Sequence, residues 1–432
     1  MKRFGFVYNE SMWLALLAGL TLSAPGPTGP SVQAQTAPRV ELVARGERWE
    51  LLRNGRPYFI KGAGASTRLQ DLVAAGANSI RTWGVDEHSG QFLDRCHALG
   101  LSVTVGFWMR KHDGFSYKSQ ADKDAQYEEL KKWVRKYRNH PAILMWAVGN
   151  EQELGTEWPE VFIQTDRLIR MVKEEDPTRP VMTVLADMWP EKQQMIERHM
   201  TSPDLLGINS YNGLSSLHER MAFWKQPYVI TEWQFDGYGD GSPQTPWGTP
   251  IEPSATEKAR RAERLYRDTI LRFPGRVLGS YLFVWNQSEV APVSTHGTHM
   301  ATGDKLAIVD TMTRLWGGRA PFNRVPEVSI IQPNAPQVVR PGEEITLKVE
   351  TRDPEGDRLT LKYEIRDNDL TKRYVGDFEQ EMSVRARGRL EGNTLRLKMP
   401  TQAGVYRILI TARDGWGGGA ADALDVKVEA GG

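Results

Sequence analysis

The chain has 432 residues, which is more than one ordinary domain needs and suggests about two or three domains. Its 55 basic and 54 acidic side chains nearly cancel, so no charge excess points to nucleic acid or to an anionic membrane surface as a partner. A single cysteine, Cys96, excludes an internal disulfide and leaves the fold to its apolar core.

The N-terminal segment has the order of regions found in an export signal. Lys2 and Arg3 precede the apolar stretch MWLALLAGLTLSA, and a Pro/Gly-rich segment ends in a small-x-small site at 32–34. This apolar run is shorter than the roughly 20 residues that a membrane span needs. We predict that residues 1–34 are a signal peptide and that the mature protein is secreted or periplasmic. The alternative is an uncleaved anchor followed by a disordered spacer.

From residue 58 onward, short β-rich runs alternate with amphipathic helical stretches. Predicted strands lie at 58–63, 77–83, 101–108, 142–149, 180–186, 205–211, 228–233 and 279–285. The last long helix opens with Ser254 and Glu257 at capping-box spacing. Eight such units in about 230 residues predict a (β/α)8 barrel, placed at 58–318. The alternative is an open doubly wound sheet, but the Gly-x-Gly-x-x-Gly turn that it requires after the first strand is missing.

Alternating β patterns flank the predicted barrel on both sides. Residues 35–57 predict a hairpin with turns at Gly46 and Gly55 that covers the bottom of the barrel. After a linker at 319–325, residues 326–432 contain short alternating runs separated by turn residues. This pattern is typical of an antiparallel, immunoglobulin-like β-sandwich.

Two patterns suggest metal binding only weakly. His296 and His299 have His-x-x-His spacing but lack a third ligand, and the acidic run DPEGDRL from Asp353 is more typical of a hairpin turn. Cys96 lies in a helix-like stretch with no partner at metal-ligand spacing. We therefore expect no metal and no cofactor.

Polar side chains occur at the ends of several predicted strands. In a (β/α)8 barrel the C-terminal ends of the strands build the active site, so polar residues there indicate function. Asn150 and Glu151 follow the fourth strand, and Glu232 lies near the end of the seventh. Two carboxylates facing each other across the barrel suit glycosidic bond cleavage, in which one acts as acid and the other attacks or activates water.

The segments around these carboxylates resemble a known family. NHPAILMWAVGNE from Asn139 and QPYVITEW from Gln226 are similar to the acid/base and nucleophile signatures of clan A glycoside hydrolases. NGRPYFIKGAG, GANSIRTWG and DLLGINSYNG are similar to the barrel domain of family 2, which includes β-galactosidases and β-glucuronidases, and RTW also resembles family 5. The similarity covers most of residues 48–290. It implies Glu151 as acid/base and Glu232 as nucleophile, with carboxyl groups about 5 Å apart.

The resemblance also implies substrate-binding residues around the two glutamates. Arg81 and Tyr211 would hold Glu232 ionised, and Asn150 would meet the sugar 2-hydroxyl. Their alternatives are a structural ion pair for Arg81 and rim packing for Tyr211. Asn209 is a further candidate, although asparagines at strand ends often cap backbone groups.

Four tryptophans at predicted strand ends are candidates for stacking on sugar rings. They are Trp83, Trp108, Trp233 and Trp285. Trp285 matches the tryptophan of the eighth strand that floors the sugar site in this clan.

The sequence therefore predicts a retaining β-glycoside hydrolase that cleaves a β-linked polysaccharide or oligosaccharide by double displacement. Because the barrel precedes its only predicted sandwich, an open, endo-acting cleft is favoured. A transglycosylase with the same catalytic pair and a non-catalytic carbohydrate-binding protein remain alternatives. The basic run Arg110, Lys111 and His112 hints at an acidic sugar but is also typical of a solvated loop.

Overall fold

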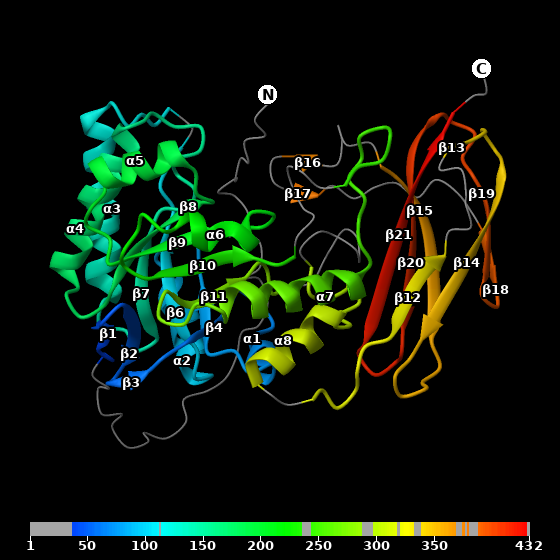
Figure 1. Ribbon diagram of the computed structural model, residues 1–432, viewed down its shortest axis with the longest axis horizontal. Helices are drawn as coiled ribbons and strands as arrows, with labels where there is room; N and C mark the ends of the chain where they lie inside the picture. The colour runs from blue at the N-terminus through cyan, green and yellow to red at the C-terminus, as the bar shows by residue number, and fades with distance from the viewer. Residues whose placement is uncertain are drawn as a thin grey trace, which may run out of the picture.

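The computed structural model describes residues 37–111, 114–235, 243–286, 297–317, 320–331, 338–368, 374–375, 378–379 and 388–429. The predicted signal peptide, His112 and His296 lie outside the described residues. Within the described ranges, every helix is too short or too polar to cross a bilayer. A mixed helix–strand domain and an all-β domain stand beside each other (Figure 1).

The first domain is a closed barrel of eight parallel strands. The strands are β4 (Ile60–Gly64), β5 (Ser79–Arg81), β6 (Ser102–Phe107), β7 (Ile143–Val148), β8 (Val181–Ala186), β9 (Leu205–Asn209), β10 (Tyr228–Trp233) and β11 (Val277–Leu282). The ring closes where β11 pairs with β4, with Leu282 opposite Ala63. This closure confirms the predicted (β/α)8 barrel and excludes the open doubly wound sheet.

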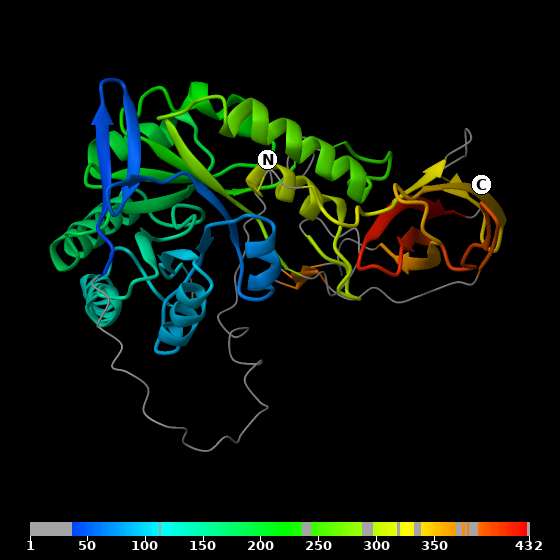
Figure 2. The same cartoon turned by 90° about the horizontal axis from the view of Figure 1, so that it is seen from below.

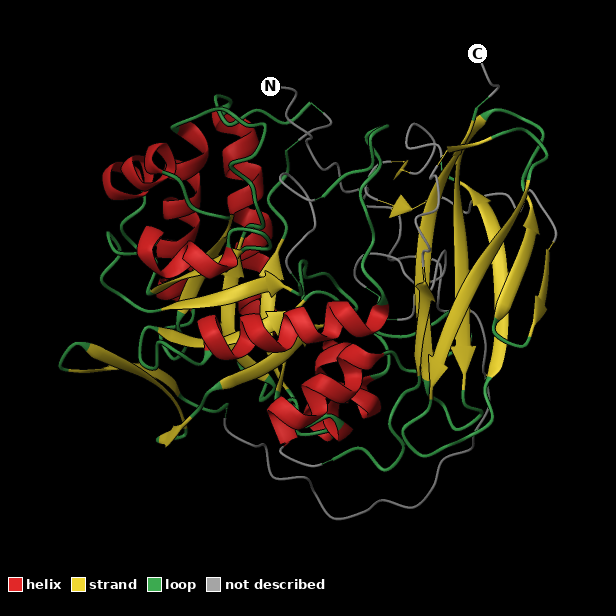
Figure 3. Cartoon of the chain, turned by 45° about the vertical axis from the view of Figure 1, so that its right-hand side comes forward, coloured by secondary structure: helices red, strands yellow, loops and turns green. Residues whose placement is uncertain are grey.

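Helices surround the barrel strands, as the red ribbons in Figure 3 show. They are α1 (Leu69–Ala74), α2 (Ser89–Ala98), α3 (Gln120–Tyr137), α4 (Glu160–Glu175), α5 (Pro190–His199), α6 (Leu217–Arg220), α7 (Ala255–Leu265) and α8 (Ala307–Gly317), with a 3-10 turn at Leu214–Ser216 and a π turn at Tyr266–Ile270. The predicted cap of α7 is present, because the Ser254 hydroxyl accepts a hydrogen bond from the Glu257 amide at 3.2 Å.

A small N-terminal sheet covers the end of the barrel where the strands begin. It consists of β1 (Val40–Arg45), β2 (Arg48–Arg53) and β3 (Arg56–Pro57). Val40 and Leu51 pack with residues of the barrel interior such as Leu144. Backbone bonds join Val40 to Thr178 at 3.1 Å and Trp49 to Gly275 at 2.9 Å, just before β8 and β11 begin. The opposite end of the barrel, hereafter the mouth, holds the C-terminal ends of the strands.

The second domain is a sandwich of two four-stranded sheets. One sheet contains β12 (Glu327–Ile331), β14 (Glu344–Arg352), β18 (Gly388–Glu391) and β19 (Thr394–Lys398), and the other contains β13 (Val338–Val339), β15 (Thr360–Asp367), β20 (Gly404–Arg413) and β21 (Gly419–Val428). A separate pair, β16 (Tyr374–Val375) and β17 (Phe378–Glu379), lies outside both sheets. The acidic run after β14 forms a turn in which Asp353 accepts bonds from the amides of Glu355 and Asp357. These sheets confirm the all-β C-terminal domain.

Polar contacts join the sandwich to the barrel on the side of α7, which packs against β21. The Arg407 guanidinium pairs with Asp425 at 2.7 Å and lies 3.8 Å from Glu252 of the segment before α7. Arg413 pairs with Asp304, which precedes α8, at 2.5 Å. In Figure 2, the small N-terminal sheet (dark blue) lies at the far end of the barrel from the sandwich. The sandwich therefore attaches to the barrel away from the end that the N-terminal sheet covers.

Candidate active site

A strained turn after β7 places Glu151 at the mouth. All six residues of β7 are buried, and the chain then turns through Gly149, which has φ +82°. A Cβ at Gly149 would meet the amide end of Gln152 at 2.3 Å, so a larger residue would strain the backbone and displace that side chain. Glu151 itself has φ +49°, which is uncommon for a residue with a side chain. Its amide bonds to the Val184 carbonyl of β8 at 3.0 Å, which holds the turn against the next strand.

Glu232 accepts three hydrogen bonds at the end of β10. Arg81 Nη1 and Trp83 Nε1 each donate to Oε1 at 2.8 Å, and the Tyr211 hydroxyl donates to Oε2 at 3.1 Å. Arg81 is fully buried, so its ion pair with Glu232 is shielded from water. These donors come from the ends of β5 and β9, which flank the mouth.

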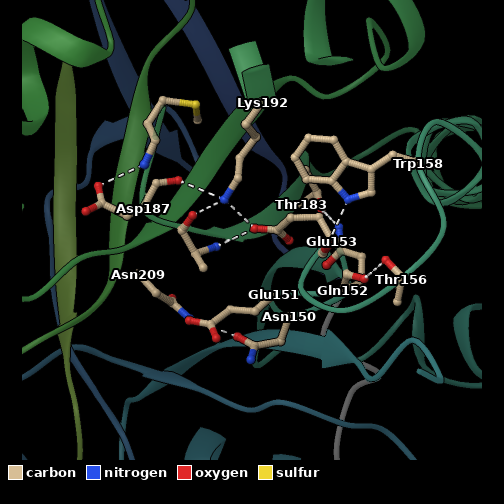
Figure 4. Close-up of polar contacts among 12 residues, drawn as sticks. Asn150, Glu151, Gln152, Glu153, Thr156, Trp158, Thr183, Asp187, Lys192 and Asn209 are labelled. Carbon is tan, nitrogen blue, oxygen red and sulfur yellow. Dashed lines mark hydrogen bonds and ion pairs between the residues drawn. The ribbon is translucent and has the colours of Figure 1, made fainter. Parts of the chain in front are cut away.

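Asparagine side chains connect the two glutamates. Arg81 Nη2 donates to Asn150 Oδ1, which also accepts from Asn209 Nδ2 at 3.1 Å. The same Asn209 amide group donates to Glu151 Oε1 at 2.9 Å (Figure 4). Its carbonyl oxygen accepts from Thr231 at 2.7 Å, which fixes the orientation of the amide. The structure thus brings together both predicted glutamates and the predicted Arg81, Asn150, Asn209 and Tyr211.

The two carboxyl groups have different electrostatic surroundings. Burial and the negative charge of Glu232 raise the pKa of Glu151 to about 7, although the hydrogen bond from Asn209 opposes the change. Glu232 instead pairs with a buried guanidinium. At neutral pH Glu151 can therefore hold or release a proton, while Glu232 faces the fixed positive charge of Arg81. Unequal surroundings of this kind separate an acid from a nucleophile.

Only two of the four predicted tryptophans reach the mouth. Trp83 and Trp108 are half-buried, and Lys111 lies over the Trp108 ring at 5.5 Å from its centroid. Trp233 and Trp285 are 0% exposed. Their neighbours are core side chains: Tyr266 lies 5.5 Å from Trp233, and Trp316 and His299 lie 6.0 Å and 5.6 Å from Trp285. A sugar cannot stack on rings enclosed in the core, so the prediction of stacking is wrong for Trp233 and Trp285.

Phe283, which sequence reasoning missed, packs against two of the residues that donate to Glu232. It is half-buried one residue beyond β11 and makes edge contacts with Trp83 at 5.8 Å and Tyr211 at 6.2 Å. Both of these neighbours donate to Glu232. Strand alternation places Phe283 on the same side as Tyr281, which contacts Ser79 inside the barrel, but it places Trp285 there as well and so does not choose between them.

A (β/α)8 barrel with two such glutamates at its mouth defines the glycoside hydrolase class. Residues 69–249 match the family model described as "Glycosyl hydrolases family 2, TIM barrel domain". Residues 69–249 of the barrel are therefore similar to the barrel domain of family 2 glycoside hydrolases, as the motifs predicted.

Named relatives share this region with the chain. A β-glucuronidase of Sus scrofa is 28% identical over 211 residues, which are 44% of this chain and 30% of the relative. A putative β-glucuronidase of Formosa agariphila is 29% identical over 204 residues, which are 44% of this chain and 17% of the relative. The chain thus spans less than a third of the length of these curated relatives. A family 2 β-galacturonidase structure from Eisenbergiella tayi has the same fold, with a TM-score of 0.50 and 17% identity over 67% of this chain and 55% of that one.

Proposed function

We propose that this protein is a retaining β-glycoside hydrolase, with Glu232 as nucleophile and Glu151 as acid/base. The observation that carries the proposal is the single hydrogen-bond network that holds one carboxylate against Arg81 and leaves the other able to carry a proton near neutral pH. Such a pair supplies both functions that double displacement requires.

In the first step, Glu232 Oε2 or Oε1 attacks the anomeric carbon and forms a glycosyl ester. The bond between that carbon and the glycosidic oxygen breaks, and Glu151 gives its proton to the departing oxygen. Arg81, Trp83 and Tyr211 orient the attacking carboxylate, because each donates to one of its oxygens. The negative charge of Glu232 disappears when the ester forms.

In the second step, Glu151 acts as the base. It takes a proton from a water molecule, whose oxygen attacks the anomeric carbon and releases Glu232 as a carboxylate. Glu151 is then protonated again and the enzyme is restored. Two inversions at one carbon return the original β configuration. Asn150 is held by Arg81 and Asn209 beside both glutamates, where it suits a contact to the sugar 2-hydroxyl.

The proposed substrate is a β-linked polysaccharide or oligosaccharide cleaved within the chain. Half-buried aromatic rings lie on two sides of the glutamates. Trp83 donates to Glu232 and Phe283 packs against Trp83, whereas Trp108 follows β6, the neighbour of the β7 strand that precedes Glu151. Rings on both sides suit sugars on both sides of the cleaved bond. Aromatic stacking does not identify the sugar.

A carboxylate-bearing sugar on the leaving-group side is part of the proposal. Glu151 protonates the leaving oxygen, so residues near Glu151 face that side. Lys111 is one of them, because its positive charge acts to lower the pKa of Glu151, and it lies over Trp108. A cation above an aromatic ring suits an acidic sugar, and the curated relatives are named β-glucuronidases.

The proposal is tested with aryl β-glycosides and with neutral and uronic-acid polymers, comparing the wild type with Glu232→Ala. We expect short oligosaccharides from the wild type alone, with the β-anomer appearing first by proton NMR. Initial α-product would refute retention, and products longer than the substrate would instead show transglycosylation. Binding without turnover across the whole panel would favour the carbohydrate-binding alternative.

Export is proposed from the basic, apolar and small-x-small order of residues 1–34. Mass spectrometry of the N-terminus of protein recovered from the periplasm or medium tests it. A chain that keeps residues 1–34 and stays cell-associated would refute cleavage.

A further inference from the structure

A buried ion pair lies two residues beyond the acid/base glutamate. Lys192 Nζ of α5 lies 2.5 Å from Glu153 Oε1, and the two side chains are 0% and 1% exposed. Fully buried lysine and glutamate are rare, because each loses its hydration in the interior. The chemistry described above uses neither residue, so the pair needs another explanation.

The pair fastens the turn that carries Glu151 to the end of β8. Glu153 Oε1 also accepts from the Ala186 amide at 2.9 Å. The Lys192 ammonium donates to the carbonyl of Ala186 and, at 3.1 Å, to that of Asp187 (Figure 4). The ring of Trp189 lies 3.6 Å from the ammonium. One buried lysine therefore connects the β7 turn, the end of β8 and the start of α5.

The turn requires such support because Glu151 has a positive φ. A residue with a side chain held in that conformation costs on the order of 1–3 kcal/mol, which the surroundings must offset. On the N-terminal side of Glu151, the turn passes through Gly149, which also has a positive φ. The Glu151 amide bonds to the Val184 carbonyl of β8. On the other side, the side chains of both Gln152 and Glu153 bond to β8, Gln152 to the Thr183 hydroxyl at 2.9 Å and Glu153 to the Ala186 amide at 2.9 Å.

The pair also contributes to the electrostatics of Glu151. The charge of Glu153 raises the pKa of Glu151, and Lys192 and Glu151 interact in turn. The charged groups acting on Glu151 from the surrounding elements are Glu232 from β10, Lys111 beyond β6, Glu153 in its own turn and Lys192 from α5. Of these four groups, Glu153 belongs to the turn that carries Glu151, and Lys192 pairs with Glu153.

We propose that Glu153 and Lys192 are positioning residues that hold Glu151 in the geometry required for proton transfer. This inference rests on the proposed function. It predicts that loss of Lys192 impairs the proton-donating step and leaves nucleophilic attack by Glu232 less affected, because Glu232 has its own support from Arg81, Trp83 and Tyr211.

The test compares two aryl β-glycosides, one with an acidic phenol that leaves without protonation and one with a poor leaving group that needs it. For Lys192→Met, we expect kcat/KM for the poor leaving group to fall about tenfold to a hundredfold relative to that for the good one. Arg179→Met is the matched control. Arg179 pairs with Asp176 at 2.9 Å, equally buried, but just before β8 at the opposite end of the strand. It should lower stability without changing the ratio.

Glu153→Gln is the second variant, because it keeps the shape of the side chain if Lys192→Met fails to fold. Removing the Glu153 charge should move the alkaline limb of the kcat/KM profile to lower pH, since that charge raises the pKa of Glu151. A folded Glu153→Gln or Lys192→Met protein with the wild-type leaving-group ratio and the wild-type alkaline limb would overturn the inference.

Glu151→Ala separates this inference from the proposed function. If Glu151→Ala shows no dependence on the leaving group, Glu151 is not the acid and the proposed function fails. If Glu151→Ala shows the dependence and Lys192→Met does not, only the positioning role fails.

Discussion

Replacing Glu151 by glutamine tests the electrostatics of the mouth through stability, without the need for a substrate. The variant keeps the size of the side chain and removes its ability to ionise. The pKa of the native carboxyl rises from an ordinary 4.5 to about 7, mainly through burial and then through the charge of Glu232. The folded protein therefore holds this proton more tightly than the unfolded chain does.

The size and sign of the effect follow from proton linkage. Below pH 4.5 the carboxyl is protonated in both states and the two proteins should be equally stable. Between pH 4.5 and about 7 the unfolded chain releases the proton while the native protein keeps it, so the wild type loses stability as the pH rises. At about 1.4 kcal/mol per pH unit over this interval, the loss reaches about 3.5 kcal/mol by pH 8. Glu151→Gln should not show this loss of stability, because glutamine does not ionise.

Urea unfolding followed by tryptophan fluorescence at pH 4.5, 6 and 8 measures the difference in unfolding free energy. We expect Glu151→Gln to be close to the wild type at the lowest pH and to exceed it by about 3–3.5 kcal/mol at the highest. Glu128→Gln, an exposed position on α3, is the control and should show no such trend. A difference between Glu151→Gln and wild type that stays constant across this range would refute the reasoning.

Three further predictions concern the groups around Glu232. Arg81→Met should lower kcat/KM by about tenfold to a hundredfold in steady-state assays and destabilise the protein by about 3–5 kcal/mol in urea, because it leaves a buried carboxylate unpaired. Trp83→Phe should reduce kcat about tenfold, since the ring remains but the N–H donor to Glu232 is lost. Phe283→Ala should raise KM with little change in the urea midpoint, because its ring is half-buried. Trp285→Ala should instead lower the free energy of unfolding by about 3–5 kcal/mol and leave KM unchanged. The reverse pattern would show that Trp285 contacts the sugar.

The strands of the barrel were predictable because each is a short apolar run whose pattern is local. β7 is a clear case, since all six of its residues are apolar and all are buried. The ends of the strands were less predictable. The eighth strand was expected to reach residue 285 but stops at Leu282, because its last ladder partner is Ala63 of β4. Hydrogen-bond pairing with the neighbouring strand decides where a strand ends, and that neighbour can be distant in sequence.

The catalytic pair was predictable for a topological reason. Parallel strands of a closed barrel all end on one face, so polar residues after different strands must meet there. The direction of each side chain was harder to predict. Trp233 follows Glu232 directly in β10, and neighbouring residues in a strand face opposite sides, so Trp233 must point into the core when Glu232 points to the mouth.

The sequence by itself determined which elements form, their order, and which two glutamates stand at the ends of the fourth and seventh strands. These features depend on local patterning and on the rule that a closed parallel barrel collects its strand ends. Only the tertiary structure decided that Phe283 contacts Trp83 and Tyr211 while Trp285 is enclosed in the core, that Asn209 connects the glutamates, and that Lys192 pairs with Glu153 in the Glu151 turn. The physical reason is that these are contacts between side chains far apart in the chain, whose partners and orientations are set by packing.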